Sequence, residues 1–251
     1  MCPILFNIGL FTIYTYGVLV FMGVMAGYLF AMREAKRCRL DTKLFSDILF
    51  WSIIGAFIGA RVLYLIVEWD MFLEEPAAML LGRAGFVFYG GVIGGLAVLY
   101  LLTRKYRVNF LEHVDIIALT IPLGHFFGRL GCFFYGCCYG RHTDSWIGIE
   151  FPHGSPAGMI GGKVIPTQLI SAFFLLMIFF LLLFIRRRQR FQGQILLSYF
   201  ILYGIFRFII EFFRGDPRGF WGIFSTSQVI ALLLIISGII GWSRLARPSR
   251  R

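Results

Sequence analysis

The sequence predicts an all-α polytopic membrane protein with seven transmembrane helices, and two observations lead to this fold class. The 251 residues are 59% hydrophobic and only 15% charged, and the mean hydropathy of +0.79 is far above that of a soluble domain. The hydrophobic residues also gather into seven runs of about 20 residues, the length that a helix needs to cross a membrane. The predicted spans are Ile13–Met32, Ile48–Val67, Ala84–Thr103, Ile116–Phe134, Pro166–Ile185, Ile195–Phe213 and Phe224–Trp242.

The lysines and arginines predict the orientation of the spans. Most of the 24 basic residues follow the first, third, fifth and seventh spans, and few lie on the opposite side. Because basic residues of short loops accumulate on the cytoplasmic side, we expect the N-terminus outside and the C-terminus in the cytoplasm. The expected cytoplasmic group is Arg33, Lys36, Arg37, Arg39, Lys43, Arg104, Lys105, Arg107, Arg186, Arg187, Arg188, Arg190, Arg244, Arg247, Arg250 and Arg251, and the outer group is Arg83, Arg141, Lys163, Arg214 and Arg218.

The distribution of charged and apolar residues also limits the classes of protein to which the chain can belong. The net charge of +11 does not indicate nucleic-acid binding, because the charges lie in short loops between apolar runs. No basic segment precedes the first apolar run, so we expect that run to remain as a transmembrane helix rather than to be cleaved as a signal peptide. No repeat, heptad pattern or low-complexity linker divides the chain. We therefore expect one integral membrane domain over residues 1–251, and a monomer.

Three arginines lie inside the predicted spans, at Arg61, Arg129 and Arg207. An arginine at membrane depth costs on the order of 3 kcal/mol on insertion scales, so each needs a compensating interaction. Glu211 follows Arg207 by one helical turn and can pair with it. The interpretation without a functional site is that Arg207 and Glu211 form a structural ion pair and that the Arg61 side chain extends to the membrane–water interface.

With the predicted orientation, all three arginines fall in the outer half of the membrane. Tyr16 and Tyr89 lie just inside the outer ends of the first and third spans, so polar groups from five helices share one level. Glycines in the third and fourth spans allow helices to approach closely. Because the guanidinium group matches phosphate geometry, we expect this cluster to bind a phospholipid head group of the outer leaflet.

Several motifs resemble those of the prolipoprotein diacylglyceryl transferase family, in family order and over nearly the whole chain. The strongest is Gly128-Arg129-Leu130-Gly131, followed by Phe133, Gly136 and Gly140. The others are Tyr16-Gly17, Gly59-Ala60-Arg61, Phe88-Tyr89-Gly90-Gly91-Val92-Ile93-Gly94, Pro166-Thr167-Gln168-Leu169 and Tyr203-Gly204-Ile205-Phe206-Arg207-Phe208-Ile209-Ile210-Glu211-Phe212-Phe213-Arg214.

This resemblance implies a reaction and its partners. The family moves diacylglyceryl from phosphatidylglycerol to the lipobox cysteine in the signal peptide of a prelipoprotein. A thioether forms and glycerol-1-phosphate leaves, without a metal or a soluble cofactor. The resemblance also implies a multi-pass protein of the bacterial cytoplasmic (inner) membrane.

The resemblance assigns roles to individual residues. Arg129 and Arg207 would hold the head group and stabilise the leaving phosphate, Glu211 would orient Arg207, and Tyr16 and Arg61 would line the cavity. The remaining substrate-binding positions are Gly90, Gly91, Cys132, Cys137 and Gly140.

The chain departs from the family pattern at four positions. Tyr89 and Ile165 stand where the family has histidine, Cys132 replaces an asparagine, and Cys137 replaces a glutamate. The usual base is therefore absent, and tyrosine, with an ordinary pKa near 10, is a poor base at neutral pH unless nearby arginines lower it. We expect Tyr89 or His125 to serve in its place, with His142 and His153 of the outer loop as further candidates.

The cysteines suggest alternatives. If the fourth span continued as a helix, Cys132 and Cys137 would point about 140° apart and could not bond. A break in the helix at Gly136 could bring the two cysteines together, and Cys138 would then remain as a thiol outside the pair. Either cysteine could line the cavity beside Arg129, form a covalent intermediate, or simply pack. The alternative functions are a lipid transferase with another acceptor, a membrane thiol–disulfide oxidoreductase using the three cysteines, and a transporter or lipid-binding scaffold.

Overall fold

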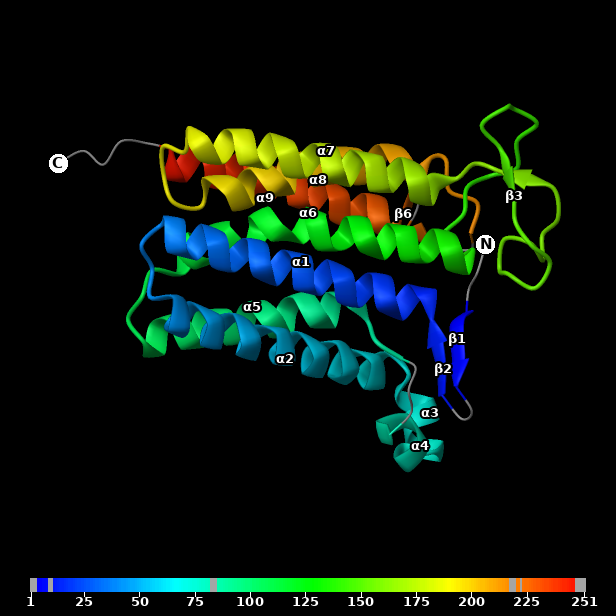
Figure 1. Cartoon of the computed structure of the whole chain (residues 1–251), viewed down its shortest axis with the longest axis horizontal. Helices are drawn as coiled ribbons and strands as arrows, with labels where there is room; N and C mark the ends of the chain where they lie inside the picture. Colours follow the sequence, from blue (N-terminus) through cyan, green and yellow to red (C-terminus); the bar gives the residue numbers. More distant parts are fainter. Residues whose placement is uncertain (1–3, 9–10, 82–84, 217–219, 222, 247–251) are drawn as a thin grey trace. The chain divides into compact units, whose positions relative to one another are not determined.

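The computed structural model describes residues 4–8, 11–81, 85–216, 220–221 and 223–246. The chain forms two compact units (Figure 1): unit 1 is Met1–Ala31 with Asp115–Arg251, and unit 2 is Met32–Val114. Their elements are β1 (Ile4–Ile8), β2 (Phe11–Tyr14), α1 (Thr15–Arg37), α2 (Thr42–Val67), α3 (Trp69–Glu74), α4 (Pro76–Leu81), α5 (Phe88–Lys105), α6 (Phe110–Tyr135), β3 (Ile149–Glu150), β4 (Lys163–Val164), α7 (Thr167–Arg187), α8 (Gln194–Glu211), β5 (Phe220–Trp221), β6 (Phe224–Ser225) and α9 (Thr226–Leu245).

The predicted spans each overlap one helix of the structure. Six of the described helices are long and apolar enough to cross a membrane, namely α1, α2, α6, α7, α8 and α9. The prediction of a polytopic all-α membrane protein is therefore confirmed. The third predicted span overlaps α5, which is not among the six. Several residues named in the sequence analysis lie outside the described residues: Arg83, Ala84, Arg218, Arg247, Arg250 and Arg251.

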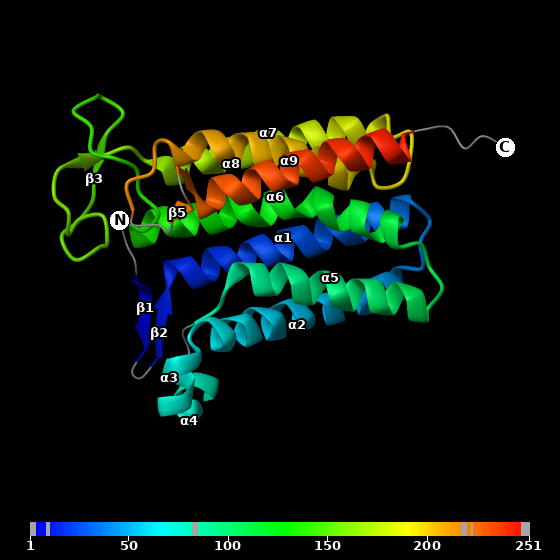
Figure 2. The same ribbon diagram turned by 180° about the vertical axis from the view of Figure 1, so that it is seen from behind.

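Unit 1 contains α7, α8 and α9 with the first part of α1 and most of α6. Its core joins α6, α7 and α8 through fully buried side chains, among them Leu119, Leu182 and Ile195. Figures 1 and 2 show the short hairpins β1–β2, β3–β4 and β5–β6 at one end of these helices and the α7–α8 connection at the other. The sequence analysis did not anticipate the hairpins, because two-residue strands carry no periodic signal.

Asp115 fixes the α7–α8 connection from within α6. Its side chain is completely buried, and its carboxylate accepts hydrogen bonds from the backbone N–H groups of Gly193 at 2.7 Å and Leu196 at 2.9 Å. The Gln189 amide donates a third at 2.6 Å. The carboxylate therefore caps the first turn of α8, whose own N-cap residue is a glycine without a side chain.

Unit 2 is organised by the contact between α2 and α5, which the glycines permit. A Cβ atom at Gly94 would lie 2.3 Å from the carbonyl oxygen of Gly55, and one at Gly90 would lie 2.3 Å from that of Gly59. The pairing of early residues of one helix with late residues of the other makes the helices antiparallel. Backbones can approach this closely only where side chains are missing, so the glycines of α5 are packing residues.

Asp115→Ala should destabilise the protein, because it leaves the N–H groups of Gly193 and Leu196 buried without an acceptor. We expect a loss of roughly 2–4 kcal/mol in the free energy of unfolding, from the lost charge-assisted bonds and the unsatisfied donors. Denaturant unfolding of the purified protein in detergent measures it. Asp115→Asn, which keeps one acceptor oxygen, should lose less. Equal stability of the alanine variant and the wild type would contradict the capping role.

Gly94→Val should separate α2 from α5, since the new side chain meets the backbone of Gly55. Overpacking of this kind costs typically about 1–3 kcal/mol, measurable as a lower unfolding midpoint. Ala97→Val is the matched control, because Ala97 lies on the same helix and its side chain is exposed. If both variants unfold at the wild-type midpoint, the glycine contact does not hold unit 2 together.

Candidate functional site

The chain reverses direction directly after α6, and this turn builds the candidate site. Helix α6 ends at Tyr135, and Gly136 then adopts a left-handed conformation with φ +79°. The N–H groups of Gly136 and Cys137 both donate to the carbonyl of Cys132, at 2.9 and 3.1 Å. Cys138 is also left-handed, with φ +62°. A non-glycine residue in this region costs about 1–2 kcal/mol, so the surroundings must hold the turn in place.

The first residues of α7 hold the turn from the other side. Thr167 donates its hydroxyl to the carbonyl of Cys138 at 2.7 Å, and Gln168 donates its amide to the carbonyl of Cys137 at 2.7 Å. Both side chains are completely buried. The amide oxygen of Gln168 has no hydrogen-bond partner among the described residues, which is uncommon for a buried polar atom.

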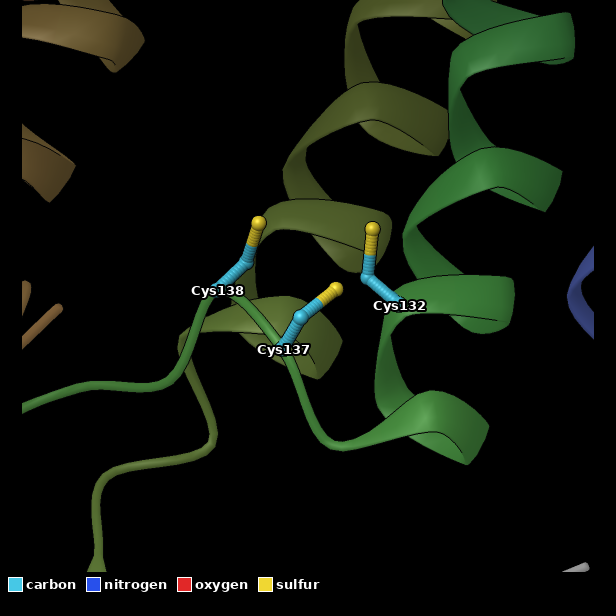
Figure 3. Close-up of side chains that lie close together, drawn as sticks. All are labelled: Cys132, Cys137 and Cys138. Carbon is cyan, nitrogen blue, oxygen red and sulfur yellow. The ribbon is translucent and has the colours of Figure 1, made fainter. Parts of the chain in front are cut away.

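The turn brings three thiols together. Cys132 extends from the last turns of α6, and Cys137 and Cys138 extend from the turn toward it (Figure 3). All three sulfur atoms lie within 4.8 Å of one another, and each thiol is free and half-buried. Of the two alternatives left open by the sequence, the break at Gly136 is the one observed, and it brings Cys137 beside Cys132 without a disulfide. Cys138 also joins the pair, which the spacing argument did not foresee.

A buried arginine borders the thiol cluster, as we call Cys132, Cys137 and Cys138. Arg214 follows α8 and holds Asp216 with two hydrogen bonds of 2.7 Å. Its guanidinium also interacts with the side chain of Cys138. Hydrogen bonds from Cys132 and Cys137, and then the charges of Arg214 and Arg129, hold the pKa of the Cys138 thiol well below its usual range despite its burial.

Arg129 lies on α6 one turn before Cys132, so the two side chains share a helix face. Arg129 is half-buried, and it has no hydrogen bond or ion pair with any residue that the structure describes. Tyr16 packs from the start of α1 against α6, where a Cβ atom at Gly131 would lie 2.9 Å from its ring. Arg129 therefore presents a guanidinium group without a hydrogen bond or ion pair to a described residue, beside the thiol cluster.

His125 lies one turn before Arg129 on the same helix. Its ring packs against that of Tyr203 on α8, with 5.7 Å between the centroids. His125 has no hydrogen bond with a described residue, so none of the described residues fixes which of its ring nitrogens carries a proton. Its imidazole ring interacts electrostatically with the positive charges of Arg129 and Arg207.

Arg207 and Glu211 form the expected ion pair on α8, at 2.9 Å, with side chains 12% and 4% exposed. Arg207 also donates to the hydroxyl of Ser227 at the start of α9, at 2.7 Å. This second contact ties α8 to α9. Part of the arginine's hydrogen-bonding capacity is thus used within the protein, unlike that of Arg129.

The remaining predicted site residues lie in structural contacts. In unit 2, Arg61 donates to the carbonyls of Gly85, at 2.9 Å, and Met79, and its guanidinium lies over the ring of Phe86. Gly90 and Gly91 face α2, and Tyr89 is exposed in the first turn of α5. In unit 1, Gly140 is wedged between two backbones, because a Cβ atom there would lie 2.6 Å from the carbonyl oxygen of Ile165.

Four residues that shape this region have no site role predicted from the sequence. Arg214 is predicted only as an outer basic residue at the end of a motif, and Cys138 only as a third thiol. Thr167 and Gln168 were recognised as part of a motif without a role. The sequence does carry a signal for these residues. Arg214 ends the motif on the sixth predicted span, and the polar residues Thr167 and Gln168 interrupt the apolar start of the fifth. Only the turn geometry shows that all four converge.

Comparisons with known proteins show the family to which the chain belongs. The family model described as prolipoprotein diacylglyceryl transferase matches residues 3–244. The chain is 38% identical to phosphatidylglycerol–prolipoprotein diacylglyceryl transferase 2 of Clostridium perfringens, over 91% of this chain and 89% of that protein. It is 36% identical to the phosphatidylglycerol–prolipoprotein diacylglyceryl transferase of Clostridium tetani, over 95% and 96%. The enzyme of that name from Chlorobaculum tepidum is 35% identical, over 97% and 90%. The chain therefore belongs to the prolipoprotein diacylglyceryl transferase family.

Proposed function

We propose that this chain transfers diacylglyceryl from phosphatidylglycerol to the cysteine thiol of a prolipoprotein. Membership of the transferase family supports this reaction. The observation that carries it is Arg129, a half-buried arginine within an apolar helix that has no partner among the described residues. Because such a charge is costly at membrane depth, a phosphate that compensates it would bind strongly.

In the proposed reaction, four residues of unit 1 bind the lipid or orient the residues that bind it. Arg129 and Arg207 hold the phosphate of phosphatidylglycerol and stabilise the charge that develops on the leaving oxygen. Glu211 keeps the Arg207 guanidinium oriented through their ion pair. Tyr16 lines the path beside Arg129. The acceptor reacts as a thiolate, so its proton must be removed before attack.

The unit 2 residues complete the proposal. Arg61 would contribute to lipid binding from α2, Gly90 and Gly91 would contribute through the close packing of α5 on α2, and Tyr89 and His125 are alternative candidates for the base. Cys132, Cys137 and Gly140 would contribute to substrate binding from the end of α6 and the following turn. The thiol–disulfide oxidoreductase alternative is not favoured, because the relatives carry the name of a lipid transferase.

We also propose seven spans in one membrane domain over residues 1–251, as a monomer in the bacterial inner membrane. The six candidate spans, a crossing by α5, and the charge asymmetry together support an outer N-terminus and a cytoplasmic C-terminus. The thiol cluster then faces the side from which a secreted prolipoprotein presents its signal peptide.

The orientation can be tested with a reporter that is active only in the cytoplasm. Fused after Arg251, the reporter should be active. Inserted near Gly158, in the loop between α6 and α7, it should be silent, because that loop would lie outside. Activity at Gly158 would reverse the assignment.

Arg129→Ala should reduce lipid transfer about 30- to 1,000-fold, which corresponds to roughly 2–4 kcal/mol of lost charge stabilisation. Arg129→Lys should recover little, because an ammonium group lacks the planar fork. The assay incubates purified protein with phosphatidylglycerol and a lipobox peptide and measures the diacylglyceryl thioether by mass spectrometry.

Arg207→Ala should show a loss of similar size but is the less direct test, since it also removes the ion-pair partner of the buried Glu211. Arg187→Ala is the control for both, because Arg187 is exposed in the last turn of α7. Wild-type transfer by the Arg129→Ala variant would refute the phosphate-binding role.

A further inference from the structure

The thiol cluster has the composition of a metal site, and the scheme above uses only Cys132 and Cys137, without a chemical role for the three thiols together. We propose that Cys132, Cys137 and Cys138 bind one Zn²⁺ ion and leave its fourth coordination position for the acceptor thiol of the prolipoprotein. This inference rests on the proposed function for the identity of the acceptor. The family resemblance implied no metal, but it also implied asparagine and glutamate at the positions of Cys132 and Cys137.

The geometry of the cluster is close to that of a bound ion. Four-coordinate zinc holds thiolates at about 2.3 Å, which places neighbouring sulfur atoms about 3.8 Å apart. The three sulfur atoms here lie within 4.8 Å of one another. Side-chain rotations that move the sulfur atoms by about 1 Å would bring them to the separation found around zinc. The left-handed turn and the hydrogen bonds from Thr167 and Gln168 already fix the backbone.

The ligand set favours zinc with an open position. Thiolates select soft ions such as zinc and copper(I). Three protein ligands with a fourth position free is the pattern of catalytic rather than structural zinc, and the described residues offer no fourth ligand to this cluster. Three thiolates and Zn²⁺ carry a net charge of −1, which the guanidinium groups of Arg214 and Arg129 would offset.

The surroundings leave room for an acceptor. All three cysteines are half-buried rather than enclosed. A Cβ atom at Gly128, one turn before Cys132 on the same face of α6, would meet nothing within 4 Å among the described residues. The unpartnered amide oxygen of Gln168 lies on the side chain that holds the Cys137 carbonyl, and it can accept a hydrogen bond from a water or a peptide N–H.

Zinc would supply what the missing family histidine does not. A thiol that coordinates a metal ion loses its proton, here to water, so no strong base is needed. The acceptor thiolate then attacks the glyceryl carbon that carries the phosphate. The C–S bond forms as the C–O bond breaks, and the electron pair leaves with the phosphate oxygen of glycerol phosphate beside Arg129. The neutral thioether is a weak ligand and leaves the zinc.

Metal binding can be measured on the full-length protein. The purified protein, kept reduced in detergent, is equilibrated with zinc alone, freed of excess metal and analysed by elemental mass spectrometry. We expect one zinc per chain, with at least about 10-fold weaker binding in Cys132→Ser, Cys137→Ser and Cys138→Ser. Cys38→Ser is the matched control, since Cys38 is also a half-buried cysteine outside any disulfide but lies in unit 2. Absence of zinc from the wild type, or equal loss in the control, would overturn the site.

The fourth position is tested with cobalt(II) in place of zinc. Tetrahedral thiolate coordination gives cobalt visible absorption bands that respond to a new ligand. A lipobox peptide should change these bands, and the same peptide with serine in place of cysteine should not. If neither peptide changes the spectrum, or if copper(I) alone binds and excludes the peptide, the acceptor does not coordinate the metal and the proposal is wrong.

A lipid-transfer assay with and without zinc distinguishes a failure of the zinc proposal from a failure of the proposed transferase function. Transfer should fall at least about 10-fold in metal-free protein and return when zinc is restored. Full transfer without metal would overturn the zinc proposal and leave the transferase function intact. Metal binding and a peptide-induced spectral change without any transfer would instead refute the transferase function.

Discussion

A charged group inside an apolar helix must find a partner within the protein, and much of this structure follows from that constraint. Asp115 is completely buried and finds three donors in the α7–α8 connection. Arg207 pairs with Glu211 and also reaches Ser227. The Asp115 bonds and the Arg207–Ser227 bond each join different elements, so meeting the electrostatic requirement also fixes how the helices of unit 1 connect. Arg129 stands apart, because no described residue forms a hydrogen bond or ion pair with it.

The end of α6 shows how a short segment can position chemistry without regular structure. Two left-handed residues, Gly136 and Cys138, reverse the chain within three positions. The buried side chains of Thr167 and Gln168 stabilise that reversal by taking up its carbonyl groups. Backbone strain at Cys138 is thus balanced by hydrogen bonds from the next helix. The result is a set of three thiols whose separation depends on the backbone rather than on their own packing.

The sequence predicted the elements whose signal is periodic or compositional. Hydropathy located every long helix, because a membrane span must be apolar over its whole length. The glycines of α5 were correctly associated with close packing, and the order of motifs identified the family. The α7–α8 cap could not be predicted, since nothing near Asp115 in sequence shows that its donors lie more than 70 residues later. The place of Cys138 in the thiol cluster could not be predicted for a similar reason, because its left-handed conformation is held by a hydrogen bond from α7.

The division of the chain into one continuous and one discontinuous unit has a consequence for biogenesis. Unit 2 is a single stretch, and its central contact between α2 and α5 needs nothing that is synthesised after residue 114. The first part of α1, by contrast, packs on α6 near Gly124 and on α7 through Phe179. Since translation delivers the N-terminus first, α1 must wait in the membrane while unit 2 assembles. The glycine-mediated helix pair is therefore the part that can fold during synthesis, and the end of α6 with its three thiols takes shape only once α7 has been inserted.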